Sequence, residues 1–379
     1  MRFRQPTSLL LTLMASAVLT ACGGGSSSTP DQTNNNNTDS ADTQVSAAAT
    51  SNASAMGAEL MASGVYDLMA DIGDTWRLTL NTSNNTFTLK VVSTAYGLSD
   101  LQGTISAGTA TGTRTSYTIK SGGSDIGKLT TDSRTQSVTG NLKVGNKEAS
   151  VSGTAYKATT LSKLAGTYNF MMATRDAVSG GSLDFGVGQI RIAADGTRAS
   201  LCRSGQFVSD TCTAVGGSTP EEASVALSLD INGLIDFANF GKGSVIASNL
   251  GKSLTMDMNR TNEEGHLRTG VWYLSEVKTL SESAINGNWS CNLSGQLSNT
   301  LAITGTSVTG TGLGNETHGK LKYNSINHTD NTWFTWTGFA AGGAITDPVS
   351  DYSLLLPLSA TLLVMESDDR IKVCNKTSH

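Results

Sequence analysis

Few side chains in this chain have the type and spacing that chemistry requires. Two of its four histidines lie near a group of aromatic residues, and imidazole is a common ligand for metal ions and haem iron. Polar residues surround both histidines, which favours solvated surface side chains, so we expect no metal ion and no cofactor. The residues concerned are His318, His328, Trp333, Phe334 and Trp336.

Two tryptophans in this group are the candidate ligand-binding aromatics. If residues 333–336 form a strand, Trp333 and Trp336 point to opposite faces, so at least one ring is exposed. An exposed ring beside Thr and Asn side chains can bind sugars or peptides, whereas the alternative is a ring partly buried in a barrel. We keep as the possible ligand-binding set His318, His328, Trp333 and Trp336.

No catalytic motif is complete. A serine hydrolase often places its nucleophile in a Gly-x-Ser-x-Gly turn, and this pentapeptide does not occur. Gly251-Lys252-Ser253 matches the end of a phosphate-binding loop, but Ile246 stands where that loop needs a glycine. Acids adjacent on a strand point to opposite faces and form no acid/base pair by themselves. Such pairs are Glu221-Glu222, Glu263-Glu264 and Asp368-Asp369.

The N-terminus has the order of an export signal. Arg2 and Arg4 precede an almost wholly apolar or small run, Ser8 to Leu19. The run holds about a dozen residues, whereas roughly 18 to 20 are needed to cross a membrane as a helix. We therefore expect cleavage rather than a permanent membrane span.

The segment Leu19-Thr20-Ala21-Cys22 resembles the lipobox of bacterial lipoproteins. The resemblance implies a diacylglycerol on the Cys22 thiol, removal of residues 1–21 as the signal peptide, and acylation of the new amino group. An ordinary cleavage site with an incidental cysteine is the alternative. The resemblance also implies sorting by the next residue, and Gly23 rather than Asp favours the outer membrane, on its periplasmic or cell-surface face.

Composition restricts both the partner and the fold class. Cleavage removes two of the 26 basic residues and no acid, leaving 24 basic and 31 acidic side chains, so we expect no nucleic-acid partner. A charged fraction of 15% and 41 glycines, with abundant Ser and Thr, indicate strands joined by tight turns. Residues 22–60 are almost free of large apolar side chains, and we expect a disordered linker there, with a short helix near residues 52–62.

Alternation of apolar and polar residues predicts β-hairpins. Alternation runs from Trp76 to Leu80, a turn follows, and alternation resumes at Phe87. Gly145-Asn146 and Asp195-Gly196 are typical of tight hairpin turns. Two apolar stretches near the C-terminus, residues 354–358 and 362–365, are too short for a membrane span and indicate two buried strands.

A short motif recurs three times, with its glycines 102 and 121 residues apart: Ser63-Gly64-Val65-Tyr66, Ala165-Gly166-Thr167-Tyr168 and Asn286-Gly287-Asn288-Trp289. These spacings match ordinary domain lengths. We expect β domains over residues 61–160, 161–280 and 281–379, each with about eight strands, the number that closes a small barrel. The fold class is therefore all-β, with tandem antiparallel barrels; sandwiches or an extended repeat are the alternatives.

The opening Gly287-Asn288-Trp289 resembles the first strand of lipocalins and related calycins, which begins Gly-x-Trp. The first two segments have Tyr66 and Tyr168 at the Trp position. The resemblance implies eight-stranded barrels in which this aromatic plugs the closed end.

Besides Cys22, the chain contains four cysteines: Cys202, Cys212, Cys291 and Cys374. An even count in an exported protein indicates disulfides. Proximity favours Cys202 with Cys212, which leaves Cys291 with Cys374 in the first and last strands of the third segment, neighbours in a closed barrel. On the chain-entropy model the two bonds contribute roughly 3 and 4.5 kcal/mol. Metal binding is the alternative, without a supporting Cys-x-x-Cys spacing.

These features predict a membrane-anchored envelope lipoprotein that is not an enzyme: a tethered string of β domains that binds a ligand or an envelope protein, or stabilises a surface assembly. One alternative is a small-molecule carrier with an apolar ligand inside a barrel. Another is a secreted enzyme whose carboxylates and histidines meet only in the fold.

Overall fold

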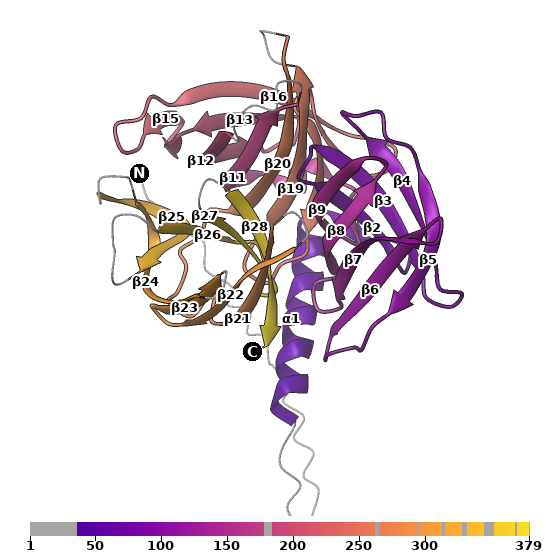
Figure 1. The fold of residues 1–379 in the computed structure, drawn as a ribbon. Helices are drawn as coiled ribbons and strands as arrows, with labels where there is room; N and C mark the ends of the chain where they lie inside the picture. The colour runs from indigo at the N-terminus through magenta and orange to yellow at the C-terminus, as the bar shows by residue number, and fades with distance from the viewer. Residues whose placement is uncertain are drawn as a thin grey trace, which may run out of the picture.

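Three closed antiparallel barrels, each of eight strands, follow one another along the chain (Figure 1). The computed structural model describes residues 36–177, 184–261, 265–293, 296–312, 315–327, 332–344, 352–367 and 370–378. The predicted all-β fold of tandem barrels is confirmed, rather than the alternative of sandwiches.

Within each barrel, neighbouring strands follow the order of the chain. Barrel 1 consists of β2 (Val65–Ala70), β3 (Asp74–Asn81), β4 (Thr86–Ser93), β5 (Leu101–Ala107), β6 (Arg114–Ser121), β7 (Ser124–Asp132), β8 (Ser137–Val144) and β9 (Lys147–Thr154). Barrel 2 consists of β11 (Gly166–Asp176), β12 (Asp184–Ile192), β13 (Arg198–Arg203), β16 (Glu221–Leu229), β17 (Ile235–Phe237), β18 (Gly241–Ile246), β19 (Ser253–Thr261) and β20 (Leu267–Glu276). Barrel 3 consists of β21 (Gly287–Leu293), β22 (Gln296–Thr304), β23 (Ser307–Gly312), β24 (Asn315–Asn327), β25 (Trp333–Ala344), β26 (Tyr352–Pro357), β27 (Leu362–Ser367) and β28 (Arg370–Ser378).

The remaining elements lie outside the barrels. They are the helix α1 (Asn36–Ala55), the paired strands β1 (Ala58–Leu60) and β10 (Tyr156–Ala158), the 3-10 helix η1 (Leu161–Leu164), and the hairpin of β14 (Gly205–Val208) and β15 (Thr211–Ala214).

The hairpins expected from alternation are present. β3 and β4 pair with Leu80 opposite Phe87, and the alternating apolar residues of both strands lie inside barrel 1. The turns at Gly145-Asn146 and Asp195-Gly196 connect β8 to β9 and β12 to β13. The two apolar stretches near the C-terminus form β26 and β27, a neighbouring pair in barrel 3.

Large interior side chains lie over glycines on the neighbouring strand in all three barrels. In barrel 2, Phe170 stands directly opposite Gly188, and a Cβ on that glycine would lie 2.6 Å from Cζ of Phe170. Equivalent pairs are Phe87 with Gly103, Leu68 with Gly153, Met172 with Gly186, and Leu321 with Gly342. These cross-strand pairs explain part of the high glycine content, because a side chain at such a position would displace its large partner.

Each recurring motif lies at the first strand of a barrel, and its aromatic residue points inward. The hydroxyl of Tyr168 donates to the carbonyl oxygen of Leu164 at 2.5 Å, and Nε1 of Trp289 donates to that of Ile285 at 3.0 Å. In both cases the acceptor lies four residues before the aromatic. Barrels 2 and 3 therefore anchor this residue in the same way at their entry.

Helix α1 corrects the expectation of a disordered linker over residues 22–60. Ala49 and Ala53 are fully buried and pack with Tyr156, because alanine lets the helix approach the barrels closely. Asp42 pairs with Arg134 of barrel 1 at 3.1 Å. Tertiary contacts thus order a segment whose composition alone predicted disorder. Within the described ranges, no helix has both the length and the apolar character that a membrane span requires.

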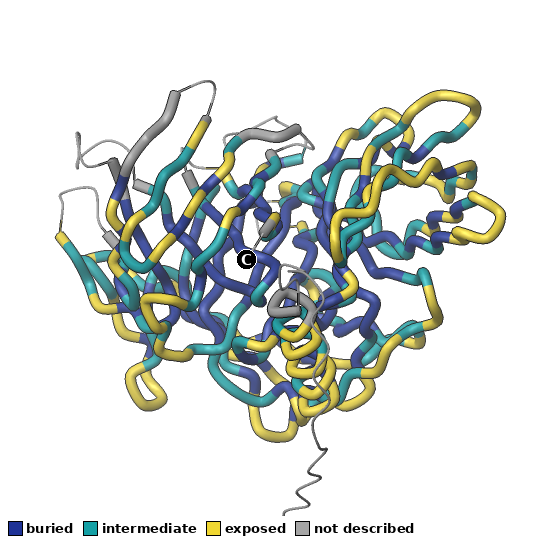
Figure 2. The backbone as a smooth tube through the Cα atoms, turned by 90° about the horizontal axis from the view of Figure 1, so that it is seen from below, coloured by how far each residue is buried: buried dark blue, intermediate teal, exposed yellow. Residues whose placement is uncertain are grey.

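The barrels pack against one another instead of forming the string of separate domains that we expected. One apolar cluster collects outward-facing residues of all three barrels, among them Met69, Met171 and Phe339. We call it the inter-barrel cluster. Buried hydroxyl groups add hydrogen bonds between barrels: Ser152 with Tyr273 at 3.1 Å, Thr135 with Thr361 at 2.7 Å, and Ser253 to the carbonyl oxygen of Leu358 at 2.7 Å. Figure 2 shows buried residues through the strands and exposed residues mainly in the outlying loops.

Candidate binding surface

Trp336 lies in the contact between barrels 2 and 3. Its side chain is 1% exposed, belongs to the inter-barrel cluster and meets Phe339 edge to face at 5.7 Å between ring centroids. Its Nε1 donates to Oδ1 of Asn169 on β11 at 2.9 Å. This burial removes Trp336 from the exposed part of the possible ligand-binding set.

A chain of side-chain amides extends from Trp336 across the outer face of barrel 2. Oδ1 of Asn169 also accepts from Nε2 of Gln189 at 3.1 Å, and Nδ2 of Asn169 donates to the carbonyl oxygen of Thr337 at 2.7 Å. Oε1 of Gln189 then accepts from the backbone nitrogen of Phe207 at 2.7 Å. We call Trp336, Asn169, Gln189 and the backbone of Phe207 the amide relay. It connects barrel 3, barrel 2 and the β14–β15 hairpin through satisfied buried polar groups.

The β14–β15 hairpin is also held by a disulfide. Cys202 of β13 is bonded to Cys212 of β15, which confirms the pairing favoured by proximity. The guanidinium of Arg191 lies over the ring of Phe207 at 4.4 Å, and Nε2 of Gln206 donates to the carbonyl oxygen of Thr335 in barrel 3 at 3.0 Å. The hairpin therefore spans from barrel 2 to barrel 3 as a fixed wall.

The second disulfide joins Cys291 of β21 to Cys374 of β28, which confirms that pairing as well. The two cysteines stand directly opposite each other in neighbouring strands of barrel 3. The bond therefore joins the first and last strands where the barrel closes.

Trp333 remains partly exposed at the edge of the same region. Its ring packs against the inter-barrel cluster, and Nζ of Lys322 lies 4.9 Å from its centroid. Both tryptophans thus contact one cluster, although a regular strand would separate them. β25 is irregular here, because its pairing with β24 steps from Thr335 to Ala340 while β24 advances by only two residues.

Four further apolar side chains flank Trp333 and are likewise partly exposed. Two come from β12 of barrel 2, one follows the hairpin, and one comes from β24 of barrel 3, and all four pack against the inter-barrel cluster. We define the junction surface as Phe185, Val187, Val215, Ile326 and Trp333. It combines an aromatic and aliphatic lining from two barrels on a support that the disulfide and the amide relay hold in place.

The two expected histidines are not placed in this surface. His318 belongs to the backbone of β24, opposite Thr309, and its side chain lies outside the described residues. His328 lies outside them altogether, as does Cys22. In the parts of the chain that are described, no group of three or more His, Cys, Asp or Glu is arranged to hold a metal ion.

The most perturbed carboxyl group lies elsewhere, between barrels 1 and 2. Asp257 is fully buried and accepts from Oγ1 of Thr75 and from the backbone nitrogen of Lys242, each at 2.5 Å. Burial raises the pKa of Asp257 to about 7 despite these hydrogen bonds, and the nearby carboxylate of Asp74 raises it further. The group serves the contact between the barrels.

Sequence reasoning missed Asn169 and Gln189, the centre of the amide relay. A single polar residue on a strand has no motif. The available signal was Asn169 itself, which interrupts the apolar run from Tyr168 to Ala173 and is fully buried. A polar residue inside such a run marks a face that meets a partner rather than water.

Neither protein-family models nor curated proteins match this chain. Among solved structures, the isotype 1 transferrin binding protein B from serogroup B Neisseria meningitidis is 13% identical, with a TM-score of 0.23, over 80% of this chain and 66% of that one. A double mutant of transferrin binding protein B from Haemophilus parasuis is 12% identical, with a TM-score of 0.19, over 80% and 65%. A porin-like protein from Bacteroides uniformis is 8% identical, with a TM-score of 0.14, over 57% and 98%. The chain thus spans just under two thirds of the two transferrin binding proteins.

Proposed function

We propose that this protein is a lipid-anchored, non-catalytic binding protein of the bacterial envelope, and that an envelope protein is its partner at the junction surface. The observation that carries the proposal is the partly exposed aromatic and aliphatic lining that two barrels present side by side. Aromatic anchors surrounded by polar residues are typical of the energetic centre of protein interfaces.

The rigidity of the support favours binding. The Cys202–Cys212 disulfide and the amide relay fix the β14–β15 hairpin and the outer face of barrel 2 before any partner arrives. A preorganised surface loses little conformational entropy on association, so more of the contact energy is available as affinity.

Anchoring would keep this surface near the membrane. Thirteen residues separate Cys22 from the start of α1 at Asn36, and even a fully extended chain of that length reaches only roughly 45 Å. Helix α1 packs on barrels 1 and 2 through Ala49 and Ala53, so the tether joins the body at a fixed place. A lipid on Cys22 would therefore restrict both the distance and the orientation of the barrels at the outer membrane.

The test is photo-crosslinking in the natural host, with a photoreactive amino acid at Trp333 or Phe185. Ile231 is the control, because it is 100% exposed in a turn beside barrel 1, away from the junction surface. We expect one adduct of defined mass from Trp333 and Phe185 and none from Ile231. Equal adducts from all three positions, or none from Trp333 and Phe185 in the correctly folded protein, would overturn the assignment.

A further inference from the structure

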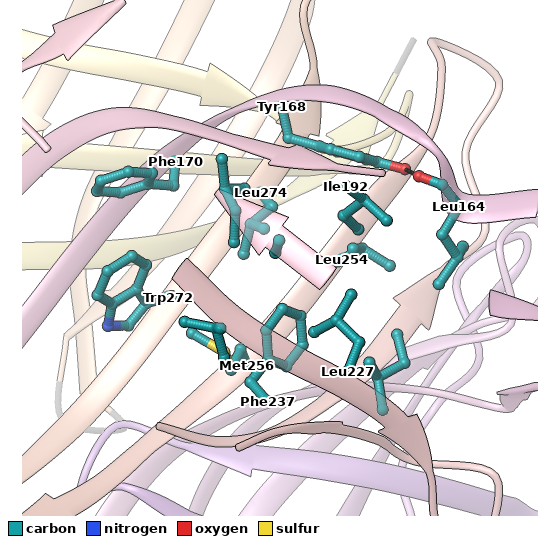
Figure 3. Packing of buried hydrophobic residues seen from close by; sticks show 14 of the residues in the cluster. Leu164, Tyr168, Phe170, Ile192, Leu227, Phe237, Leu254, Met256, Trp272 and Leu274 are labelled. Atoms are coloured by element: carbon teal, nitrogen blue, oxygen red, sulfur yellow. Dashed lines mark hydrogen bonds between the residues drawn. The ribbon is translucent and has the colours of Figure 1, made fainter. Parts of the chain in front are cut away.

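The interior of barrel 2 changes from apolar to charged toward one end. Tyr168 and Leu164 lie at one end of its core, and Phe170 and Trp272 lie at the other (Figure 3). Beyond the second end, period two places charged side chains on the inward face, because inward positions alternate along each strand. Met258 is followed by Arg260 on β19, Trp272 is preceded by Arg268 on β20, and Leu201 is followed by Arg203 on β13.

Most of these charges are already paired. Asp184 of β12 accepts from Arg203 at 2.7 Å and from Arg268 at 3.1 Å, and Glu221 accepts from Arg203 at 3.3 Å. Asp176, on the inward face of β11, pairs with Nδ1 of His266 at 3.0 Å.

Arg260 differs from the other two arginines. Its guanidinium lies over the ring of Phe240 at 4.4 Å, and its buried Nε has no hydrogen-bond partner among the described residues. The salt bridges of the described residues leave its charge without a carboxylate.

A second buried donor lies close to Arg260. The edge of Phe240 meets Trp272 at 6.4 Å between ring centroids, so one ring separates the arginine from the indole. Trp272 is 2% exposed, and its Nε1 has no acceptor in the described part of the chain. A buried donor without an acceptor costs about 1 to 3 kcal/mol, which makes two of them around one ring a marked feature of this core.

The large side chains at this end lie along the wall of the barrel. Phe170 and Met172 cover Gly188 and Gly186 on the next strand, and Phe237 covers Gly243. Each large group therefore lies over a neighbouring strand. The inward-facing donors of Arg260 and Trp272 share this end with an apolar lining.

We propose that this end of barrel 2 binds a small carboxylate with an apolar body. Both unpartnered donors require an acceptor, and the charge of Arg260 selects an anionic oxygen over a neutral one. The rings of Phe240 and Phe170 and the methionine side chains accommodate the apolar part. The inference is independent of the junction surface, which lies on the outside of the barrels.

The test is calorimetric titration of the full mature chain with octanoate, and with octanol as the neutral molecule of equal length. We expect octanoate to bind at least about tenfold more tightly than octanol, because one hydrogen bond to a charged group accounts for such a ratio. Absence of octanoate binding at millimolar concentration, or equal binding of octanol, would overturn the proposal.

A matched arginine supplies the control variant. Arg191 lies over Phe207 at 4.4 Å on the outer face of the same barrel, the same distance as Arg260 over Phe240. We expect Arg260→Gln to weaken octanoate binding at least about tenfold and Arg191→Gln to leave it unchanged. Trp272→Phe should weaken octanoate binding while the melting temperature confirms folding. Equal loss in Arg191→Gln, or none in folded Arg260→Gln and Trp272→Phe, would contradict the assignment of the two donors.

Discussion

The indole nitrogen of Trp336 in barrel 3 donates to the side-chain oxygen of Asn169 in barrel 2, with 2.9 Å between the two atoms. The same oxygen accepts from Gln189, and the amide nitrogen of Asn169 donates to the backbone of Thr337. One buried side chain therefore satisfies partners in its own barrel and in the next. The contact between these barrels depends on it.

We expect Asn169→Leu to lower the free energy of unfolding by about 2 to 4 kcal/mol, because it leaves the donors of Gln189 and Trp336 without an acceptor in a buried place. Trp336→Phe removes one donor and should cost about 1 to 2 kcal/mol. Urea unfolding measures both. Asn84→Leu is the control, since Asn84 accepts only from Thr86 in an exposed turn. Equal unfolding midpoints for Asn169→Leu and Asn84→Leu would show that the relay does not stabilise the body.

Gly188→Ala should destabilise barrel 2 although alanine is the smallest side chain available. The new methyl group would lie 2.6 Å from Cζ of Phe170 and 2.3 Å from the carbonyl oxygen of Cys202. Overpacking of this kind costs typically about 1 to 3 kcal/mol. Gly108→Ala is the matched control, because the nearest atom to its new methyl group would be 3.5 Å away. Thermal melting that shifts equally for both variants would contradict the cross-strand packing.

Asp257 should make stability depend on pH. Its pKa is raised to about 7 in the folded protein, so the folded state binds this proton more tightly than the unfolded chain. Its contribution is complete below about pH 4 and is lost as the pH rises through 7. Asp257→Asn stays neutral, so the stability of the variant relative to the wild type should rise between these values by on the order of 2 to 4 kcal/mol.

Melting temperatures at a series of pH values check this expectation. Asp100→Asn is a suitable control, because Asp100 accepts the backbone nitrogen of Val91 at an exposed position. If the wild type and Asp257→Asn lose stability in parallel from pH 4 to pH 8, the carboxyl group of Asp257 is not the source of the dependence.

Cys22→Ser should release the protein from the membrane without unfolding it. The proposed lipid is the anchor, and the barrels carry their own disulfides and cores. Detergent phase partitioning and labelling with a fatty-acid analogue measure the effect: the wild type should partition with detergent and the variant with water. Cys202→Ser serves as a control that should retain the label. A variant that still partitions with detergent would disprove the lipid anchor.

Local pattern was sufficient for the strands and their closure. Alternation from Trp76 to Phe87 predicted a hairpin, and the Gly-x-aromatic motif marked the first strand of each barrel. Both disulfide pairings followed from proximity and barrel closure. These features depend on neighbouring strands, and the side-chain period of a strand is written directly in the sequence.

Contacts between distant segments were decided only by the tertiary structure. Composition predicted disorder for residues 36–55, yet burial of Ala49 and Ala53 orders them as α1. The link from Asn169 to Trp336 joins residues 167 positions apart. No periodicity records which outer face of one barrel meets another, because an outward polar residue looks the same whether water or a second barrel satisfies it. The sequence therefore determined three barrels, and their packing determined where the candidate surfaces lie.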